Sequence, residues 1–241
     1  MDFSFLSQDL TYLLWGTFPE EPPGGALLTL IISAVSGVCS AVLGLLLGVL
    51  LVMLKGWPQR VLVAVSEFLR AIPVLMLIFW VYFLLPVVLG WSVPGVFSVM
   101  LALALVSAAY LAHGVAAGIR SIAATQWDAG MALGMTRWQT LRYIVLPQAL
   151  RIMLPSFVNQ WATLVKDSSL AYIVGVEELS LLATRVNSQI MLYPAEVFLF
   201  VGGVYWLLCS AIDVLAAWLG RKARVVQRSP EPARPLASAV Q

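Results

Sequence analysis

The feature that most constrains this chain is residues 24–54, a run that contains no charged side chain. About 20 consecutive apolar residues in a helix are enough to cross the hydrocarbon core of a bilayer. Soluble domains contain about 25% charged residues, whereas this chain of 241 residues is 61% hydrophobic and only 11% charged. A water-soluble core cannot use so much apolar surface. We therefore predict an all-α polytopic membrane protein.

The apolar segments predict about five transmembrane helices, over residues 24–54, 61–89, 95–119, 150–175 and 196–219. Pro73 follows the first part of the second span and is predicted to bend it. We divide the chain into an N-terminal lead (1–23), a transmembrane domain (24–220) that contains the loop at 120–147, and a disordered C-terminal tail (221–241). The lead is expected to contain a short interfacial helix around Leu10–Trp15. The tail is basic and then rich in Pro, Ala and Ser, a composition typical of disorder.

The basic residues of this topology fall mostly on one side. Lys and Arg accumulate in cytoplasmic loops, so the loop between the third and fourth spans and the C-terminus are predicted to be cytoplasmic, and the N-terminus extracytoplasmic. The residues on the basic side are twelve of the fourteen Lys and Arg: Lys55, Arg60, Arg70, Arg120, Arg137, Arg142, Arg151, Arg221, Lys222, Arg224, Arg228 and Arg234.

The loop at residues 120–147 carries two predicted helix starts. Thr125 stands three residues before Asp128, and Thr136 stands three residues before Gln139. Both spacings fit a capping box, in which the hydroxyl accepts a backbone N–H and the acid or amide reaches back. The loop is therefore expected to be helical and ordered.

Two further residues are predicted to end these helices. Gly134 can adopt the left-handed conformation that closes the first helix, and Pro147 is expected to stop or kink the second. The first helix would then be small and apolar around a single acid, through Ala129, Met131, Ala132, Leu133 and Met135. Such a helix could lie on lipid headgroups or insert into a groove of another protein.

The residue order in this loop favours the second interpretation. Asp128-Ala129-Gly130, then Gly134, then Ile144-Val145-Leu146-Pro147 resembles the Glu-Ala-Ala loop of ABC-importer membrane subunits. The resemblance implies a coupling helix that docks on a cytoplasmic ATPase. Asp128 stands where that family has Glu, and Gly130 stands for the second Ala, which weakens the helix by up to ~1 kcal/mol. The coupling residues implied are Asp128, Ala129, Gly130, Leu133, Gly134 and Pro147.

Ionisable residues inside the spans each require an explanation, because insertion costs roughly 2.5–3.5 kcal/mol per charge. Lys166, Asp167, Ser168 and Ser169 form the densest cluster. They could line a polar path for a zwitterionic or charged solute, or form a buried network that joins two spans.

A second ionisable group lies in the second span. Glu67 and Arg70 are three residues apart on one helix face, which favours an ion pair in a gate region over solute binding. The single histidine, His113, is interpreted as a hydrogen-bonded core group.

These same segments extend the resemblance. Glu67-Phe68-Leu69-Arg70-Ala71-Ile72-Pro73, Leu146-Pro147-Gln148-Ala149 and Lys166-Asp167-Ser168-Ser169-Leu170 are similar to motifs of the histidine/glutamine/glutamate group of importer permeases. The sequences of the second and fifth spans look most like those of the glutamate/aspartate members. His113 and Ala116 depart from the group, which usually has Glu and Arg there. The resemblance implies that Lys166, Asp167, Ser168, Ser169, Arg70 and Glu67 line the substrate path.

The resemblance also implies a function and a set of partners. The chain is expected to be the membrane subunit of an ATP-driven amino-acid importer in the bacterial inner membrane, moving glutamate, aspartate or another polar amino acid. It would form a dimer with itself or a homologous permease, contacting membrane lipid but no nucleic acid. A cytoplasmic ABC ATPase dimer and an extracytoplasmic solute-binding protein would bind to it.

Other functions were weighed against this one. The chain has no Gly-Lys-Ser/Thr phosphate-binding motif, so ATP hydrolysis is expected on a partner chain. One His and two Cys, Cys39 and Cys209, provide no metal spacing, so no metal or cofactor is expected and an intramembrane enzyme is disfavoured. A permease for a different small solute, or a non-transporting scaffold, remains the alternative.

Overall fold

The computed structural model describes residues 6–90, 92–190 and 194–225, and these residues form helices joined by short turns. The only extended pairing among them is one isolated β-bridge, between Gly25 and Glu178. The elements are α1 (Leu6–Trp15), α2 (Gly25–Met53), α3 (Trp57–Ala71), α4 (Val74–Phe79), the π-helical η1 (Trp80–Leu84), α5 (Leu85–Leu89), α6 (Gly95–Arg120), α7 (Ala124–Ala132), α8 (Arg137–Thr140), the π-helical η2 (Leu141–Val145), α9 (Leu146–Asp167), the 3₁₀-helical η3 (Ser168–Val174), α10 (Leu179–Ile190) and α11 (Pro194–Val225).

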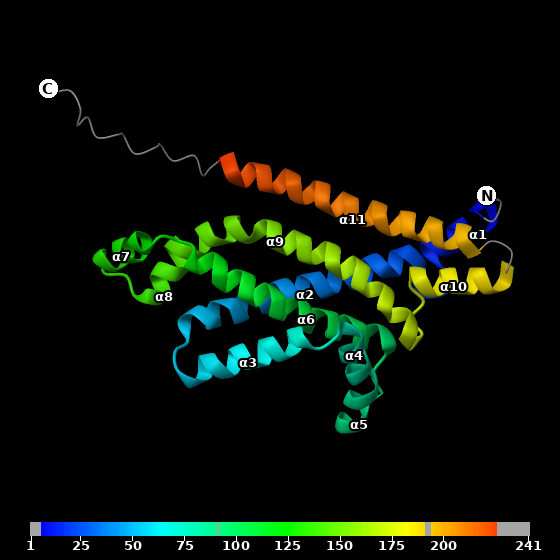
Figure 1. The fold of residues 1–241 in the computed structure, drawn as a ribbon, viewed down its shortest axis with the longest axis horizontal. Helices are drawn as coiled ribbons and strands as arrows, with labels where there is room; N and C mark the ends of the chain where they lie inside the picture. The colour runs from blue at the N-terminus through cyan, green and yellow to red at the C-terminus, as the bar shows by residue number, and fades with distance from the viewer. Residues whose placement is uncertain (1–5, 91, 191–193, 226–241) are drawn as a thin grey trace.

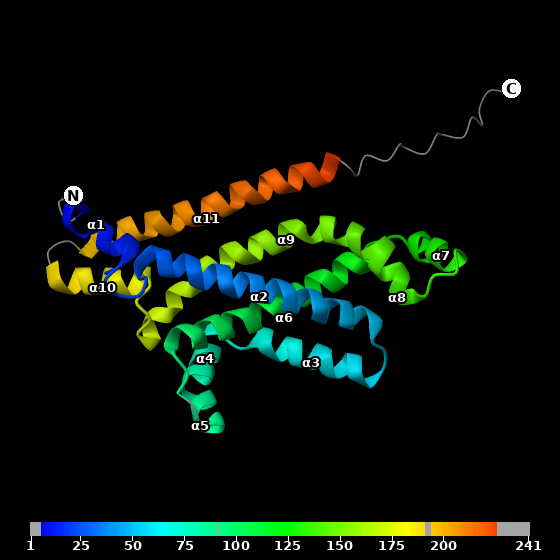
Figure 2. The same ribbon diagram turned by 180° about the vertical axis from the view of Figure 1, so that it is seen from behind.

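The long helices α2, α6, α9 and α11 lie side by side along one axis (Figures 1 and 2). The short helices α7 and α8 project from one end of this bundle, which we call the loop end. Helices α1 and α10 lie together at the other end, which we call the α10 end. The first described helix and the last turns of α11 therefore lie toward opposite ends, as an odd number of spans requires.

The predicted all-helical membrane class is confirmed, and each predicted span coincides with helical structure. Among the described residues, α2, α6 and the part of α11 from Pro194 to Leu215 are long and apolar enough to cross a membrane, and the bent α3–α5 segment could provide a fourth span. The fourth predicted span corresponds to α9, which has 22 residues, or about 33 Å at 1.5 Å per residue. Length suits α9 to crossing, but Arg151, Lys166 and Asp167 make it more polar than the others.

The predicted bend at Pro73 is present and sharp. Helix α3 ends at Ala71, and the axis of the following α4–α5 segment is turned by 103° from it. Pro73 lacks the N–H that a continuing helix would need, and proline disfavours the helical conformation of the residue before it. Ile72 is accordingly extended, at φ −80° and ψ 134°. Figure 1 shows α4 and α5 running across the direction of the other helices.

The centre of the bundle is the contact between α2 and α6, which small residues allow to be very close. Ser36, Ser40, Gly44 and Gly48 recur at every fourth position of α2, so they share one face, and all four are buried. A Cβ atom added to Gly44 would lie 2.6 Å from Leu111 Cβ, and one added to Gly48 would lie 2.7 Å from the Ala112 carbonyl oxygen. Small residues allow membrane helices to approach in this way.

A separate small core lies at the α10 end. It joins α1, the start of α2, α10 and α11 through Leu13, Ala26, Leu179, Leu182, Ala183, Val186, Val197 and Val201. The sequence predicted a polar connection over residues 176–195, whereas the structure has the helix α10 there. Its signal was present, because Leu179, Leu182, Ala183 and Val186 have the i, i+3, i+4, i+7 spacing of a buried helix face.

The predictions for the lead and the tail can be compared with the structure in part. The predicted helix in the lead is confirmed as α1, Leu6–Trp15. Helix α11 continues to Val225, so the first five residues assigned to the tail are helical. The rest of the predicted disordered tail, 226–241, lies outside the described residues, as do residues 1–5 of the lead.

The α2–α6 contact generates a matched pair of variants. Gly48→Ala should destabilise the folded protein by about 1–3 kcal/mol, the usual cost of overpacking, because the new methyl group meets α6. Gly114→Ala, on α6, has nothing within 4 Å of the added Cβ and should leave stability unchanged or raise it slightly. Thermal unfolding in detergent measures the stability of both variants, through the fraction of protein that remains in the monodisperse peak after heating. Equal melting temperatures would contradict the proposed close packing.

Candidate coupling loop and transport residues

The loop at 120–147 folds as a compact pair of short helices. Helix α7 closes at Gly134, which has φ +78°, and its N–H donates to the Met131 carbonyl oxygen at 2.9 Å. The Met135 N–H then donates to the Gly130 carbonyl oxygen at 3.1 Å. These bonds satisfy carbonyl groups that the end of a helix leaves open. The predicted role of Gly134 in closing the first helix is confirmed.

One of the two predicted capping boxes is present. Thr136 Oγ1 accepts from the Gln139 backbone N–H at 3.3 Å, and the Thr136 N–H donates to Gln139 Oε1 at 2.8 Å. The prediction for Thr125 was wrong. Helix α7 already begins at Ala124 after an Ala123 N-cap that makes no side-chain bond, so Thr125 lies inside the first turn, where its hydroxyl cannot cap.

Pro147 does not stop the second helix, which was one of the two effects predicted for it. The helical path from Arg137 to Asp167 continues through it, with the π-helical turn η2 immediately before. Pro147 occupies the first turn of α9. A π-helical turn changes the hydrogen-bond register, and proline is tolerated in a first turn because its missing N–H is not needed there. The second loop helix is therefore a direct extension of α9.

Gly130 has a packing role that sequence reasoning missed. It is buried, and an added Cβ would lie 2.6 Å from Thr140 Cγ2 and 2.7 Å from Thr140 Oγ1. Thr140 itself is fully buried. The sequence alone indicated only that Gly130 weakens the helix. The structure shows that glycine brings α7 against α8, a reason that no local pattern could reveal.

The two faces of α7 differ. Trp127 packs against the buried cluster that the ends of α2 and α6 form with η2 and α9, and the Arg137 guanidinium lies 5.7 Å from its ring centroid. On the other face, Asp128 and Ala129 are exposed, and Met131 and Leu133 are 50% and 79% exposed. The loop thus presents a fixed apolar surface beside one carboxylate. Exposed apolar surface of this kind is available for contact with another protein or with lipid.

Glu67 and Arg70 form the predicted ion pair, at 2.9 Å between Oε1 and Nη1. Sequence reasoning missed how the pair connects to α6. The Arg70 guanidinium lies 4.9 Å from the Tyr110 ring centroid, and His113 Nε2 lies 3.4 Å from Glu67 Oε1 and 3.2 Å from Ser66 Oγ. His113 is therefore hydrogen-bonded, as predicted. Because Glu67 is still 55% exposed, its carboxylate also remains accessible.

The cluster from Lys166 to Ser169 ends α9 and begins η3, toward the α10 end. The hydroxyl of Ser168 donates to the Val165 carbonyl oxygen at 2.8 Å, and that of Ser169 donates to the Lys166 carbonyl oxygen at 2.7 Å. Both bonds stay within the same helical run, so these hydroxyls join no second span. Lys166 is exposed and Asp167 half-buried, and in the described part of the chain neither forms an ion pair.

The polar residues of α9 lie on a face that the single chain does not cover. Ser156, Asn159 and Lys166 are exposed, and the exposed Thr163 hydroxyl bonds only to the Asn159 carbonyl oxygen, at 3.2 Å. These four residues follow the helical repeat, so they form one stripe. The structure does not bring this stripe and the Glu67–Arg70 pair together, since the latter contacts α6.

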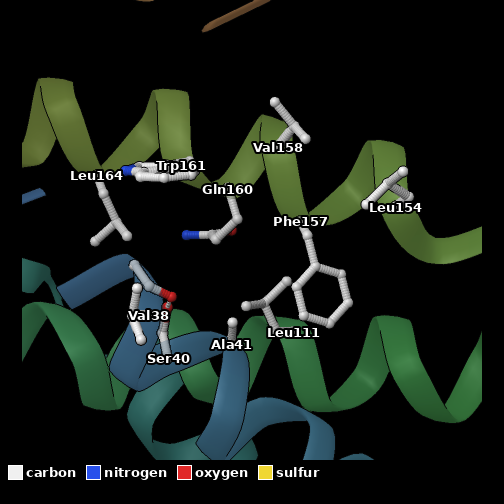
Figure 3. A pocket seen from close by; sticks show the side chains of 11 residues that line it. Val38, Ser40, Ala41, Leu111, Leu154, Phe157, Val158, Gln160, Trp161 and Leu164 are labelled. Carbon is white, nitrogen blue, oxygen red and sulfur yellow. Dashed lines mark hydrogen bonds between the residues drawn. The ribbon is translucent and has the colours of Figure 1, made fainter. Parts of the chain in front are cut away.

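Two cavities lie among the described helices. An apolar crevice of about 230 Å³ is enclosed by α2, α6 and α9; Figure 3 shows Leu111, Phe157 and Trp161 around it. Gln160 is its main polar group and donates to Ser107 Oγ at 3.1 Å. A second cavity of about 590 Å³ lies between the starts of α2 and α6 and residues 174–177, with Glu21, Tyr82 and Glu177 in its wall. Only the second has polar groups suited to a polar solute.

Comparison with known proteins places these features in a family. The family described as "Binding-protein-dependent transport system inner membrane component" matches residues 40–225. The chain is 34% identical over 198 residues to the probable amino-acid ABC transporter permease protein YckA of Bacillus subtilis, covering 80% of this chain and 85% of that protein. It is 32% identical over 239 residues to the glutamate/aspartate import permease protein GltK of Escherichia coli O157:H7, covering 92% and 97%.

The fold comparison agrees. A crystal structure described as an amino acid ABC transporter with histidines has a TM-score of 0.78 and 25% identity, and the match covers 92% of this chain and 100% of that one. Such solved ABC transporter complexes imply ATPase partner subunits, and subunits of this kind do not themselves hydrolyse ATP. The chain therefore belongs to the family of binding-protein-dependent transport system inner membrane components, as a multi-pass permease subunit of an ABC importer.

Proposed function

We propose that this chain is the permease of a polar amino-acid importer and that α7 is the helix through which a cytoplasmic ATPase drives it. The observation that carries the proposal is the exposed surface of α7, Asp128, Ala129, Met131 and Leu133, held on a compact loop at one end of the bundle. The name of GltK, a glutamate/aspartate import permease that is 32% identical to this chain, supports the substrate class.

The contacts of the loop would transmit movement of α7 to the spans. Trp127 ties α7 to the cluster formed by the ends of α2 and α6, and α8 continues through η2 into α9 without a break. Because a continuous helix moves as a rigid element, displacement of α7 and α8 would displace α9. ATP-driven closure of two ATPase subunits would then pull the loops of two permease chains together and switch the path between inward and outward access.

The polar stripe of α9 supports a second permease chain. Ser156, Asn159, Thr163 and Lys166 are costly against lipid, so such residues face a bundle interior or a water-filled path. A path between this face and a partner permease, either a second copy or a homologue, would satisfy them. Lys166 and Asp167 would then lie near its α10 end, with Glu67 and Arg70 as a further part of the substrate path.

The orientation follows from the distribution of charge. The loop end carries Arg120, Arg137, Arg142 and Arg151, which supports a cytoplasmic position for it. The α10 end would face outward, with the N-terminus, and would receive an extracytoplasmic solute-binding protein. The cavity that contains Glu21 and Glu177 lies at this end and would serve as the entry to the path.

The docking assignment predicts a position-specific loss of the ATPase. Gly134→Glu should abolish co-purification of the ATPase while leaving the chain inserted, because a side chain in the left-handed conformation costs roughly 1–2 kcal/mol and adds a carboxylate beside Asp128. Gly90→Glu is the matched control, since Gly90 is also left-handed, at φ +71° and ψ 16°, with nothing near its Cβ position, but lies outside the loop. A Gly134→Glu variant that keeps its ATPase would show that the docking assignment is wrong.

The two threonines of the loop allow a milder test. Thr136→Ala removes a working N-cap, worth about 1 kcal/mol, so it should weaken ATPase binding several-fold by loosening α8. Thr125→Ala removes no cap and should bind the ATPase as the unchanged chain does. Titration of labelled ATPase onto permease in nanodiscs gives both affinities. Equal weakening by both changes would argue that the loop is not held by the Thr136 cap.

The substrate assignment predicts glutamate uptake that depends on Lys166. Liposomes containing this chain, its ATPase and its binding protein should take up labelled glutamate on addition of ATP. Lys166→Gln should slow uptake about tenfold, since loss of a charged hydrogen-bond partner costs about 1.5–3 kcal/mol. Lys55→Gln, just after the end of α2 at the loop end, should have little effect on uptake. Uptake of arginine or glutamine but not glutamate would contradict the acidic-substrate proposal and leave the importer proposal intact.

A further inference from the structure

Glu178 is a fully buried carboxylate that plays no part in the proposed path or in the docking loop. It lies just before α10 at the α10 end of the bundle, and among the described residues its hydrogen bonds go to neither Lys166–Ser169 nor Glu67. Burying a charge is costly unless hydrogen bonds replace the lost water. The surroundings of Glu178 therefore indicate what it contributes.

Three donors from two elements bind this carboxylate, and a hydroxyl of a third element lies near it. The backbone N–H groups of Ser180 and Leu181, in the first turn of α10, donate at 2.9 and 3.0 Å. The Tyr205 hydroxyl of α11 donates at 2.8 Å, and the Thr29 hydroxyl of α2 lies at 3.5 Å. Burial raises the pKa of Glu178, and the hydrogen bonds from Ser180, Tyr205 and Leu181 oppose that shift. The carboxylate caps α10 and binds α11, and Thr29 of α2, whose hydroxyl donates to the Gly25 carbonyl oxygen at 3.2 Å, lies beside it.

Neighbouring contacts reinforce the same junction. Thr29 Oγ1 accepts from the Leu179 N–H at 3.3 Å, and the Gly25 N–H donates to the Glu177 carbonyl oxygen at 2.9 Å. Ser180 Oγ lies 3.0 Å from the Tyr205 hydroxyl. The apolar cluster of Leu179, Leu182, Val197 and Val201 surrounds this polar centre.

Helix α11 depends on this junction more than the other long helices do. Of the three long apolar helices, it is the least buried. Among its side chains described by the structure, only Val197 and Val201 are buried, and both belong to the cluster around Glu178. From Tyr205 toward the loop end, the described side chains of α11 are half-buried or exposed. The buried side chains of α11 are therefore at one end, although the helix also packs along α9, where the Cys209 thiol donates to the Ala162 carbonyl oxygen at 3.7 Å.

We propose that Glu178, through Tyr205 and Thr29, clamps the α10-end parts of α2, α10 and α11 into one rigid body. The clamp keeps these parts together while the loop-end part of α11 can change its position against α9. It works as a fixed end for α11 during the conformational cycle. That last point rests on the proposed importer function, whereas the clamp itself does not.

Hydrogen exchange on the chain alone in nanodiscs tests the clamp without the ATPase. Tyr205→Phe should speed exchange of the backbone amides of 179–186 and 195–205 about tenfold, as expected for loss of one hydrogen bond to a charged acceptor. Tyr172→Phe, an exposed tyrosine outside the junction, is the control and should change nothing. Exchange in α7 and α8 should be the same in all variants. Equal exchange in Tyr205→Phe and Tyr172→Phe, or faster exchange spread evenly over the whole chain, would overturn the clamp.

A second matched pair changes the acceptor itself. Glu178→Gln replaces one acceptor oxygen with an NH2 group that must face another donor, so it should speed the same amides more than Tyr205→Phe. Glu177→Gln alters the adjacent residue, whose carboxylate pairs with Arg185 at 2.6 Å near the surface, and should spare them. If Glu178→Gln does not insert, Tyr205→Phe and Thr29→Val decide. A Glu178→Gln chain that exchanges like Glu177→Gln would contradict the proposal.

Spin-label distances test rigidity in the working complex. With Cys39 and Cys209 replaced by Ser, one label pair joins Thr184 of α10 to Leu207 of α11, and another joins Ile152 of α9 to Val214 of α11. ATP should leave the first distance unchanged and alter the second. A first distance that changes with ATP overturns the clamp. Failure of the ATPase to co-purify would count against the proposed function instead, and the exchange result would still decide the clamp.

Discussion

The close contact between α2 and α6 is the interaction on which the rest of this structure depends. Lipid tails are as apolar as the helices, so the hydrophobic effect does not drive spans together. Membrane helices associate instead by van der Waals packing and hydrogen bonds, and both interactions weaken steeply with distance. The small residues Ser36, Gly44 and Gly48 allow the two backbones to approach, and the Ser36 hydroxyl donates across the contact to the Met100 carbonyl oxygen at 3.2 Å. Both functional ends of the molecule are built on this pair.

At the loop end, the pair provides a base for the coupling helices. The ends of α2 and α6 bury Val49, Val115 and Ile119 against η2 and α9, and Trp127 of α7 packs on the same cluster. At the other end, the first turn of α2 holds Thr29 in the junction around Glu178. The same two helices therefore connect the proposed docking surface of α7 with the junction around Glu178. This arrangement suits a subunit that converts movement on one side of a membrane into access on the other.

The sequence predicted features that depend on local chemistry. Proline at 73 bends a helix wherever it occurs, glycine at 134 permits a left-handed turn, and the Thr136–Gln139 spacing specifies a cap. It was wrong where local patterns compete. Thr125 has the spacing of a cap, but the helix begins before it, and Pro147 looks like a stop, but the π-helical turn before it carries the helix onward. Helix α10 was missed because its polar residues concealed a regular buried face.

The sequence by itself determined the membrane class, the helical architecture and the family, because long charge-free runs and short motifs act through their own composition and spacing. Only the tertiary structure decided what Gly130, His113 and Glu178 do. Gly130 is needed because Thr140 lies against it, His113 gains partners from α3, and Glu178 accepts hydrogen bonds from α10 and α11 beside Thr29 of α2. Such roles depend on which atoms approach across large sequence separations, up to 149 residues for Thr29 and Glu178, and packing alone fixes those distances.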